Sequence, residues 1–328
     1  MIAPIALTCG EPAGIGLEIA LGAWQRLRGE VDFFLIADGN HLRAISGNVP
    51  VVEIADPAGA VAAMPDGLPF LNHDFPAPNH PGTPSAANAA AVVAVIDRAV
   101  DLLQRGSAGA VVTNPIHKKA LHDGADFAFA GHTEYLAQLG GVRHAVMMLA
   151  APGLRVVPVT VHMALADVPR RLTPDLLRDT IRITHTALLH DFGISSPRLA
   201  ITGLNPHAGE GGAMGDEETG ILMPVLQALR QQGMDLTGPL AADSMFHADA
   251  RKTYDAAIAM YHDQALIPLK TLDFHNGTNV TLGLPFVRTS PDHGTALDIA
   301  GKGLANPSSL IAALRQAASL AQTRAGAT

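Results

Sequence analysis

Three histidines of the chain share one feature: each follows a short apolar run of the kind that forms a buried strand. The pairs of run and histidine are Val156–Val161 with His162, Leu199–Leu204 with His207, and Ala256–Tyr261 with His262. In α/β folds, ligands collect outside the carboxyl ends of strands, where loops are free to converge. Three neutral imidazoles with an open coordination position are typical of a catalytic Zn, Co or Mn site. A metal held in this way can bind a substrate hydroxyl and lower its pKa, so the pattern predicts metal-assisted chemistry.

The same spacing also fits a simpler interpretation. The chain has fifteen histidines, so three of them can be ordinary polar loop residues, and no HExxH helix supports a metal site. If a metal is bound, nearby carboxylates are expected to accept hydrogen bonds from the ring N–H groups and fix the tautomers. The candidate acceptors are Asp263, Asp243 and Asp167.

His132 and Thr133 place an imidazole and a hydroxyl directly before a predicted helix, in the run Gly131-His132-Thr133-Glu134. Free backbone N–H groups at a helix N-terminus can bind an oxyanion, and both side chains could help. The alternative is a capping box with Thr133 as the N-cap, which the residue types favour.

A cationic or amide side chain recurs in the segment after His262, where we expect few strands. Such groups suit a phosphate or carboxylate substrate, although each alone is more often a solvated side chain. The residues are Lys270, Asn279 and Arg288.

Two glycine-rich turns follow predicted strands. Gly10, Gly14 and Gly16 match neither the G-x-G-x-x-G fingerprint nor a P-loop, so this turn does not establish a Rossmann site. The loop 205–215 is glycine-dense beyond what a connection requires, which suits either close approach to a ligand or a flexible surface loop.

The composition excludes several classes of protein. The 328 residues suggest two domains or one large α/β unit, and with 48% hydrophobic and 16% charged residues the chain can form a sizeable core. A net charge of −8 and 4% aromatic residues disfavour nucleic acid as a partner. The single Cys9 excludes a disulfide framework. We expect no signal peptide and no membrane span, and therefore a cytoplasmic location.

The order of apolar runs and helical stretches predicts an α/β architecture. A hairpin-like joint at Pro152-Gly153 implies some antiparallel pairing. A helix should begin at Pro174 with Thr173 as its cap, and Ser85 should cap another. Segments 56–84 and 275–307 are expected to be mostly loop. The expected strands cover 2–7, 31–37, 108–113, 145–150, 154–161, 198–204 and 256–261.

The segment His293–Pro307 (HGTALDIAGKGLANP) resembles the adenosine-binding loop of the isocitrate and isopropylmalate dehydrogenase superfamily, whose fold binds NAD without a Rossmann fingerprint. Further motifs, in order along residues 5–312, resemble the 4-hydroxythreonine-4-phosphate dehydrogenase (PdxA) family. They are Gly10–Gly16, Thr113–Lys118, Gly131–Glu134, Leu204–Gly212, Tyr261–Gln264 and Gly277–Val280.

The resemblance implies a two-domain α/β fold with a mixed sheet. It implies a cofactor-side domain of 1–135 plus 290–328 and a metal, substrate and dimerisation domain of 136–289, with the active site in the cleft. It further implies a homodimer whose active site lies at the subunit interface, with the metal ligands shared between subunits.

For the site residues, the resemblance implies one divalent metal ion per subunit (Zn²⁺, Co²⁺, Mg²⁺ or Mn²⁺), bound by His162, His207 and His262. It implies that His132, Thr133, Lys270, Asn279 and Arg288 bind the phosphorylated substrate. The cofactor-binding residues of the adenosine loop would be His293, Gly294, Thr295, Ala296, Asp298 and Asn306.

The implied activity is NAD-dependent oxidation of 4-phosphooxy-L-threonine at C3, followed by decarboxylation to 3-amino-2-oxopropyl phosphate in pyridoxal 5′-phosphate biosynthesis. Lys270 and Asp243 are the candidates for the catalytic base. NAD is expected over NADP, because a carboxylate at Asp298 would accept hydrogen bonds from a ribose 2′-hydroxyl and repel a 2′-phosphate. The alternatives are a related dehydrogenase acting on 4-phospho-D-threonate, erythronate or a cyclic dihydrodiol, and a non-catalytic metal- or phosphate-binding protein.

Overall fold

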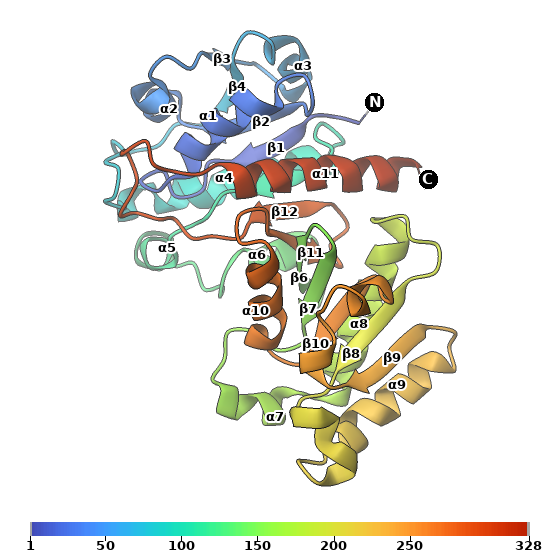
Figure 1. The fold of residues 1–328 in the computed structure, drawn as a ribbon. Helices are drawn as coiled ribbons and strands as arrows, with labels where there is room; N and C mark the ends of the chain where they lie inside the picture. The colour runs from blue at the N-terminus through green and yellow to red at the C-terminus, as the bar shows by residue number, and fades with distance from the viewer. Residues whose placement is uncertain (1, 327–328) are drawn as a thin grey trace. The chain divides into compact units, whose positions relative to one another are not determined.

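The computed structural model describes residues 2–326, which form two compact units (Figure 1). Unit 1 comprises residues 2–143 and Leu284–Gly326, and unit 2 comprises His144–Gly283. The chain therefore leaves unit 1, builds unit 2 and returns. Among residues 2–326, no helix combines the length and the hydropathy that crossing a bilayer would need.

In unit 1 every strand pairs parallel with its neighbours, in the order β3-β4-β2-β1-β5-β12. The runs IALT of β1 and FFLIA of β2 are buried at every position, as expected for parallel strands that helices cover. The strands are β1 (Ile5–Thr8), β2 (Phe33–Ala37), β3 (Val51–Glu53), β4 (Leu68–Asn72), β5 (Val111–Thr113) and β12 (Arg288–Pro291). The helices are α1 (Gly16–Leu27), α2 (Gly39–Ser46), α3 (Ala60–Ala63), α4 (Ala89–Gln104), α5 (Lys118–Ala125), α6 (His132–Leu139) and α11 (Ser308–Gly326).

Unit 2 has mixed strand pairing, in the order β11-β6-β7-β10-β8-β9. The hairpin of β6 and β7 is antiparallel, as the Pro152-Gly153 joint predicts, and β7, β10, β8 and β9 are parallel. The strands are β6 (Val146–Ala151), β7 (Leu154–Pro158), β8 (Arg198–Thr202), β9 (Asp235–Leu240), β10 (Ala256–Ala259) and β11 (Thr278–Leu282). The helices are α7 (Val168–Arg171), α8 (Pro174–His190), α9 (Met223–Arg230) and α10 (His262–Leu272).

The two residues predicted to cap helices, Thr173 and Ser85, differ in the hydrogen bonds that they make. Thr173 caps α8 as predicted, because its hydroxyl accepts a hydrogen bond from Leu176 N at 3.2 Å. Ser85 makes no such bond, and a 3-10 turn, Ala86–Asn88, precedes α4. Ser85 thus occupies the predicted N-cap position, at the start of the 3-10 turn that leads into α4, but its side chain makes no capping hydrogen bond.

Two segments predicted as loop contain strands. Within 56–84, β4 is buried between its parallel neighbours β2 and β3, although Pro69 in this strand has no N–H group to donate. Within 275–307, β11 pairs with β6 and β12 with β5. Frequent prolines and glycines predicted loops there, but pairing with buried neighbours outweighs that local preference.

Candidate functional site

His162 and His262 lie side by side, with ring centroids 5.7 Å apart. Their strands, β7 and β10, are parallel neighbours, and the contact continues past the strand ends: Val159 N donates to Ala259 O at 2.8 Å and Thr160 Oγ1 to Met260 O at 2.8 Å. Parallel strands that end together deliver the two imidazoles to one place, as the strand-end argument predicts.

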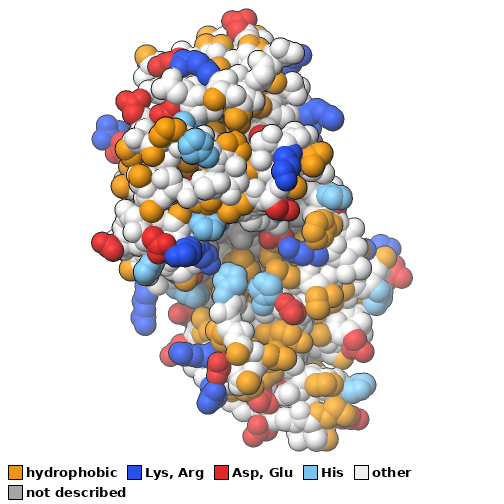
Figure 2. Space-filling model, turned by 90° about the vertical axis from the view of Figure 1, so that its left-hand side faces the viewer, with side chains coloured by type: hydrophobic (Ala, Val, Ile, Leu, Met, Phe, Trp, Pro, Cys, Tyr) orange, Lys and Arg blue, Asp and Glu red, His pale blue; other side chains and the backbone are white. Residues whose placement is uncertain are grey.

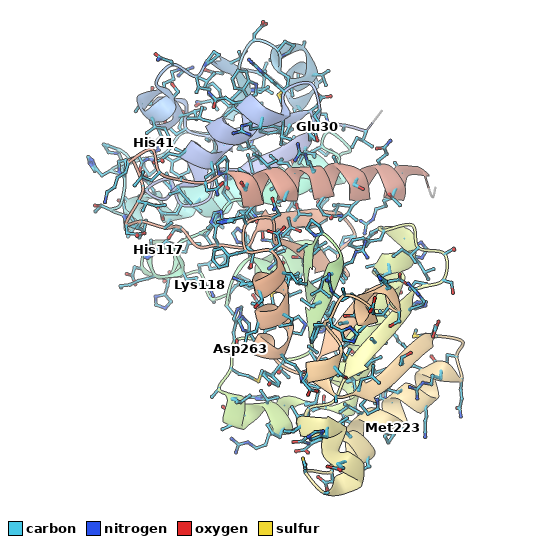
Figure 3. All side chains as sticks on the ribbon, in the orientation of Figure 1. Glu30, His41, His117, Lys118, Met223 and Asp263 are labelled. Carbon is cyan, nitrogen blue, oxygen red and sulfur yellow. The ribbon has the colours of Figure 1, made fainter. Side chains whose placement is uncertain are left out.

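The two histidines line a pocket of about 420 Å³. His262 Nδ1 lies 2.7 Å from Asp263 Oδ1, so a proton on Nδ1 leaves the Nε2 lone pair available for a ligand. Asp263 is thus the acceptor that the sequence suggested, and it lies at the start of α10 (Figure 3). His162 adopts φ 45°, a left-handed conformation that is uncommon for a residue other than glycine and that often marks functional sites.

His207 lies within a loop segment and not directly after a strand. The 3-10 segment Pro206–Gly212 holds six consecutive residues at positive φ, from His207 at 52° to Gly212 at 100°. His207 is exposed. Within residues 2–326 of one chain, no three His, Cys, Asp or Glu side chains form a group able to hold a metal ion, so His207 does not complete the His162–His262 pair.

The buried carboxylate of Glu218 binds Asn205, the residue that precedes the His207 loop. Glu218, 3% exposed, accepts hydrogen bonds from Asn205 N at 2.8 Å and Asn205 Nδ2 at 3.0 Å. Burial alone would raise the pKa of Glu218, but the hydrogen bonds from Asn205 hold it below the usual value. A Cβ on Gly209 would stand 2.6 Å from Glu218 Oε2, so this position of the loop requires glycine.

Of the two candidate bases, only Lys270 lies near the histidine pair. Lys270, on α10, lines a pocket of about 380 Å³ together with His262 and Asp263. Asp243 is exposed in the short turn Ala242–Ser244 and lines neither pocket at His262. Asp167, the third suggested acceptor, instead pairs with Arg170.

The three predicted substrate residues of the late segment all belong to regular elements, contrary to the expectation of a strand-poor region. Lys270 is helical, Asn279 lies on β11 and Arg288 begins β12. The Oδ1 atom of Asn279 is buried without a hydrogen-bond partner among the described residues. Such an unsatisfied acceptor is costly unless a ligand or water supplies a donor.

Unit 1 contains a buried cation next to an unsatisfied imidazole. Arg288 is 3% exposed and donates to Thr113 Oγ1 from Nε at 3.2 Å and from Nη2 at 2.6 Å. Burial lowers the pKa of Arg288 to about 10, so the guanidinium remains charged at neutral pH. His132 Nε2 is buried and has no hydrogen-bond partner within residues 2–326.

Burial, with the positive charges of Arg288 and Lys118, holds the pKa of His132 well below its usual value. His132 is therefore neutral at pH 7, and a neutral imidazole has one N–H group that can donate a hydrogen bond. His132 is the first residue of α6, and Gly131 is its N-cap, with no side-chain hydrogen bond. Thr133 therefore lies inside the first turn and is not the N-cap, so the capping-box interpretation was wrong. A buried guanidinium, an unsatisfied imidazole and an uncapped helix start together suit a phosphate group.

Lys118 is a further cation of this group, and the sequence alone predicted no role for it. Its Nζ atom lies 3.8 Å from where a Cβ on Gly131 would stand, and it follows His117 at the start of α5 (Figure 3). Thr113, the partner of Arg288, was overlooked in the same way. Both residues lie in the motif Thr113–Lys118, where a threonine at a strand end and a lysine at a helix start were the available signals.

The predicted adenosine loop packs against the first glycine turn of unit 1. Ile15 N donates to Thr295 O at 3.0 Å, and a Cβ on Gly14 would stand 2.8 Å from that same oxygen. Glu18 of α1 accepts a hydrogen bond from Gly301 N. The turn therefore supports the loop instead of forming a Rossmann phosphate site.

Within this loop, the predicted cofactor residues differ in exposure and in hydrogen bonding. Asp298 and Gly294 are exposed, and Ala296 has φ 47°. His293 Nε2 is buried without a hydrogen-bond partner among the described residues. Asn306 Oδ1 accepts from Ser308 N at 3.0 Å and Ser308 Oγ at 2.7 Å, so it also caps the start of α11. An exposed carboxylate and an unsatisfied imidazole are groups that a ribose and a base could engage.

Comparison with known proteins identifies the family of the chain. The family model described as "Pyridoxal phosphate biosynthetic protein PdxA" matches residues 30–317. The chain belongs to this family. A curated 4-hydroxythreonine-4-phosphate dehydrogenase of Roseobacter denitrificans is 60% identical over 321 residues, which cover 97% of each chain.

Two solved structures extend the comparison. A 4-hydroxythreonine-4-phosphate dehydrogenase of Klebsiella pneumoniae is 35% identical with a TM-score of 0.88, covering 98% of this chain and 100% of the other. A terephthalate 1,2-cis-dihydrodiol dehydrogenase of Burkholderia xenovorans is 28% identical with a TM-score of 0.66, covering 97% and 98%. These structures confirm the predicted α/β fold, and relatives named as dehydrogenases match 97–98% of this PdxA-family chain.

Proposed function

We propose that the chain oxidises 4-phosphooxy-L-threonine at C3 with NAD as acceptor, and that the resulting 3-oxo acid loses CO₂ to give 3-amino-2-oxopropyl phosphate for pyridoxal 5′-phosphate biosynthesis. The observation that carries the proposal is the pairing of His162 and His262 at adjacent strand ends. Membership of the PdxA family supports the choice of substrate, because the relatives are named for it.

The residues at the strand ends fit a divalent ion only in part. His162 and His262 provide two imidazoles, whereas catalytic zinc sites in proteins have three protein ligands. We propose that His207 of the partner subunit supplies the third, so that each homodimer holds two shared sites. A divalent ion bound there would lower the pKa of a substrate hydroxyl and neutralise charge that develops on the adjacent oxygen. Zn²⁺, Co²⁺, Mn²⁺ and Mg²⁺ are the candidates, and imidazole ligands favour the first two.

Exposed apolar side chains on unit 2 support a second copy as the partner. Large hydrophobic side chains come to the surface on the face of unit 2 shown in Figure 2. Leu165 and Ile267, which line the pockets at His262, are 66% and 63% exposed. Phe274, whose ring centroid lies 5.7 Å from Lys270 Nζ, is 71% exposed. Clustered exposed apolar side chains are typical of protein interfaces.

The substrate's phosphate is assigned to Arg288, His132 and Thr133, with Lys270 and Asn279 as further substrate contacts. Arg288 brings a permanent charge, and neutral His132 can donate one hydrogen bond. Of the candidate bases, Lys270 is better placed than Asp243 to remove the C3 hydroxyl proton, because it shares a pocket with His262. Lys270 would act as a base only in its neutral form.

The test of the function is NADH formation from defined substrates, with and without divalent cation. We expect 4-phosphooxy-L-threonine to have the highest kcat/KM and the rate to fall to background after chelation. A higher kcat/KM with 4-phospho-D-threonate, erythronate 4-phosphate or a cyclic dihydrodiol would replace the substrate assignment. The dihydrodiol is included because the Burkholderia xenovorans structure is named for such a substrate. Turnover of none of them, without NAD binding, would favour a non-catalytic binding protein.

The nicotinamide cofactor is expected to be NAD because of Asp298, whose exposed carboxylate lies on the predicted adenosine loop. A carboxylate accepts hydrogen bonds from a 2′-hydroxyl and repels a 2′-phosphate. In Asp298→Asn, the preference for NAD over NADP, measured as the ratio of kcat/KM values, should fall by roughly tenfold, equivalent to about 1.4 kcal/mol. Asp292→Asn on the same stretch is the matched control. A wild-type protein that prefers NADP would contradict this role of Asp298.

A further inference from the structure

We propose that Gln264 is a positioning residue for the metal site: its side-chain amide fixes the ends of β8 and β10 together and so couples the His162–His262 pair to the loop that carries His207. The metal-related half of this proposal rests on the proposed function. The structural half can be measured in the protein without metal.

Gln264 uses both ends of its amide. Oε1 accepts hydrogen bonds from Met260 N and from Thr202 Oγ1, each at 2.7 Å, and Nε2 donates to Gly203 O at 2.8 Å. Thr202 and Met260 are fully buried. Three hydrogen bonds with buried partners fix the orientation of the amide and cannot be replaced by bulk water without cost.

The amide bridges two neighbouring strands beyond their last paired residues. β8 and β10 are parallel, and their register ends at Ile201↔Ile258. The backbone then separates: β10 leads to His262, and β8 leads through Gly203 to Asn205 and His207. Gln264 joins the two strands at this point of separation, because it contacts Met260 on one side and Gly203 on the other.

The same network reaches the third strand. Met260, whose N–H is bound by Gln264, accepts a hydrogen bond from Thr160 Oγ1 at 2.8 Å through its carbonyl oxygen. Thr160 follows β7 and precedes His162. The three strand ends that carry the predicted ligands are therefore connected through Met260 and the amide of Gln264. Asn205 N, beyond the end of β8, donates separately to Glu218 Oε1 at 2.8 Å.

This network has a consequence for a shared site. In the proposed dimer, the chain builds half a site with His162 and His262 and provides His207 to the partner subunit. Gln264 then connects the half-site that the chain builds with the ligand that it provides. Groups that hold ligands in place are worth roughly 10- to 100-fold in metal affinity, because ligands must be fixed within about 0.5 Å of the productive geometry.

The test uses Gln264→Met, which keeps the length of the side chain and removes all three hydrogen bonds. Co²⁺ binding is measured by titration calorimetry and by the visible spectrum of bound Co²⁺, and amide hydrogen exchange is measured without metal. We expect roughly 10-fold weaker Co²⁺ binding or more, an altered Co²⁺ spectrum and faster exchange at Met260 and Asn205. Thr202→Val should show a smaller effect, and Thr202→Ser, which keeps the hydroxyl, should restore the wild-type values. If Gln264→Met does not fold, the comparison of Thr202→Val with Thr202→Ser still tests whether the Gln264 network affects Co²⁺ binding and exchange.

The matched control is Thr184→Val, which removes another buried hydroxyl of unit 2, one that donates to Thr180 O at 2.8 Å within α8. It should lower Tm to a similar extent without changing Co²⁺ affinity. Wild-type Co²⁺ affinity and wild-type exchange in both Gln264→Met and Thr202→Val would overturn the proposal. A wild-type protein that binds no Co²⁺ would overturn the metal site itself and the metal-related half with it, whereas exchange would still decide whether Gln264 fixes the strand ends.

Discussion

His262→Ala and His207→Ala are each expected to lower kcat/KM by about 10³-fold or more, since a metal ion stabilises transition-state charge by several kcal/mol. The fold should persist, because His207 is exposed and the His262 side chain is 38% exposed. The rate of NADH formation and the Co²⁺ affinity of the same samples check the prediction, with Tm as the measure of folding.

The matched control for these variants is His190→Ala, which removes an exposed histidine of unit 2 at the end of α8. It should leave the rate, the Co²⁺ affinity and Tm at wild-type values. A His262→Ala enzyme that kept its turnover in the presence of a chelator would contradict the metal site.

Arg288→Met is expected to raise the KM for the phosphorylated substrate by roughly 10- to 100-fold, because hydrogen bonds to charged groups contribute about 1.5–3 kcal/mol. Methionine retains the volume of the buried stem, so the loss should reflect the guanidinium. Thr113→Val removes only the acceptor that orients Arg288, and we expect a smaller increase in KM. Steady-state kinetics of NADH formation give both values.

Inorganic phosphate as a competitive inhibitor separates binding from chemistry for these variants. Its inhibition constant should rise in Arg288→Met by the same factor as KM. Arg105→Met is the control, because Arg105 is exposed in unit 1 and pairs with Asp101. Unchanged phosphate inhibition in Arg288→Met would remove Arg288 from the phosphate site, whatever happens to kcat.

The strand-end histidines could be predicted because two rules act together. Buried apolar runs such as Ala256–Tyr261 form strands from local composition, and parallel neighbours end at a common edge. What the sequence could not supply was which strands are neighbours. The pairing of β7 with β10 brings His162 to His262, whereas the path of the Pro206–Gly212 loop, with its run of positive φ values, directs His207 elsewhere.

The environment of Arg288 was the largest departure from the sequence analysis. A glycine- and proline-rich surrounding predicted an exposed loop, but Arg288 begins a buried strand that pairs with β5. Its hydrogen bonds to Thr113 link positions far apart in the chain, and such tertiary contacts leave no local pattern. The start of α6 could not be predicted from local residue types either. The residue types of a capping box are present at Thr133, yet the helix begins before it, at His132.

The shared metal site is tested most directly by mixing two inactive variants. His207→Ala and His262→Ala, unfolded together and refolded as a mixture, form hybrid dimers in which one site combines the intact His162–His262 pair of one subunit with the intact His207 of the other. Random pairing should restore about a quarter of the wild-type activity, because half of the dimers are hybrids and each has one complete site of two. If the mixture shows no more activity than the two variants alone, the metal ligands do not come from two subunits, and the proposed site is wrong.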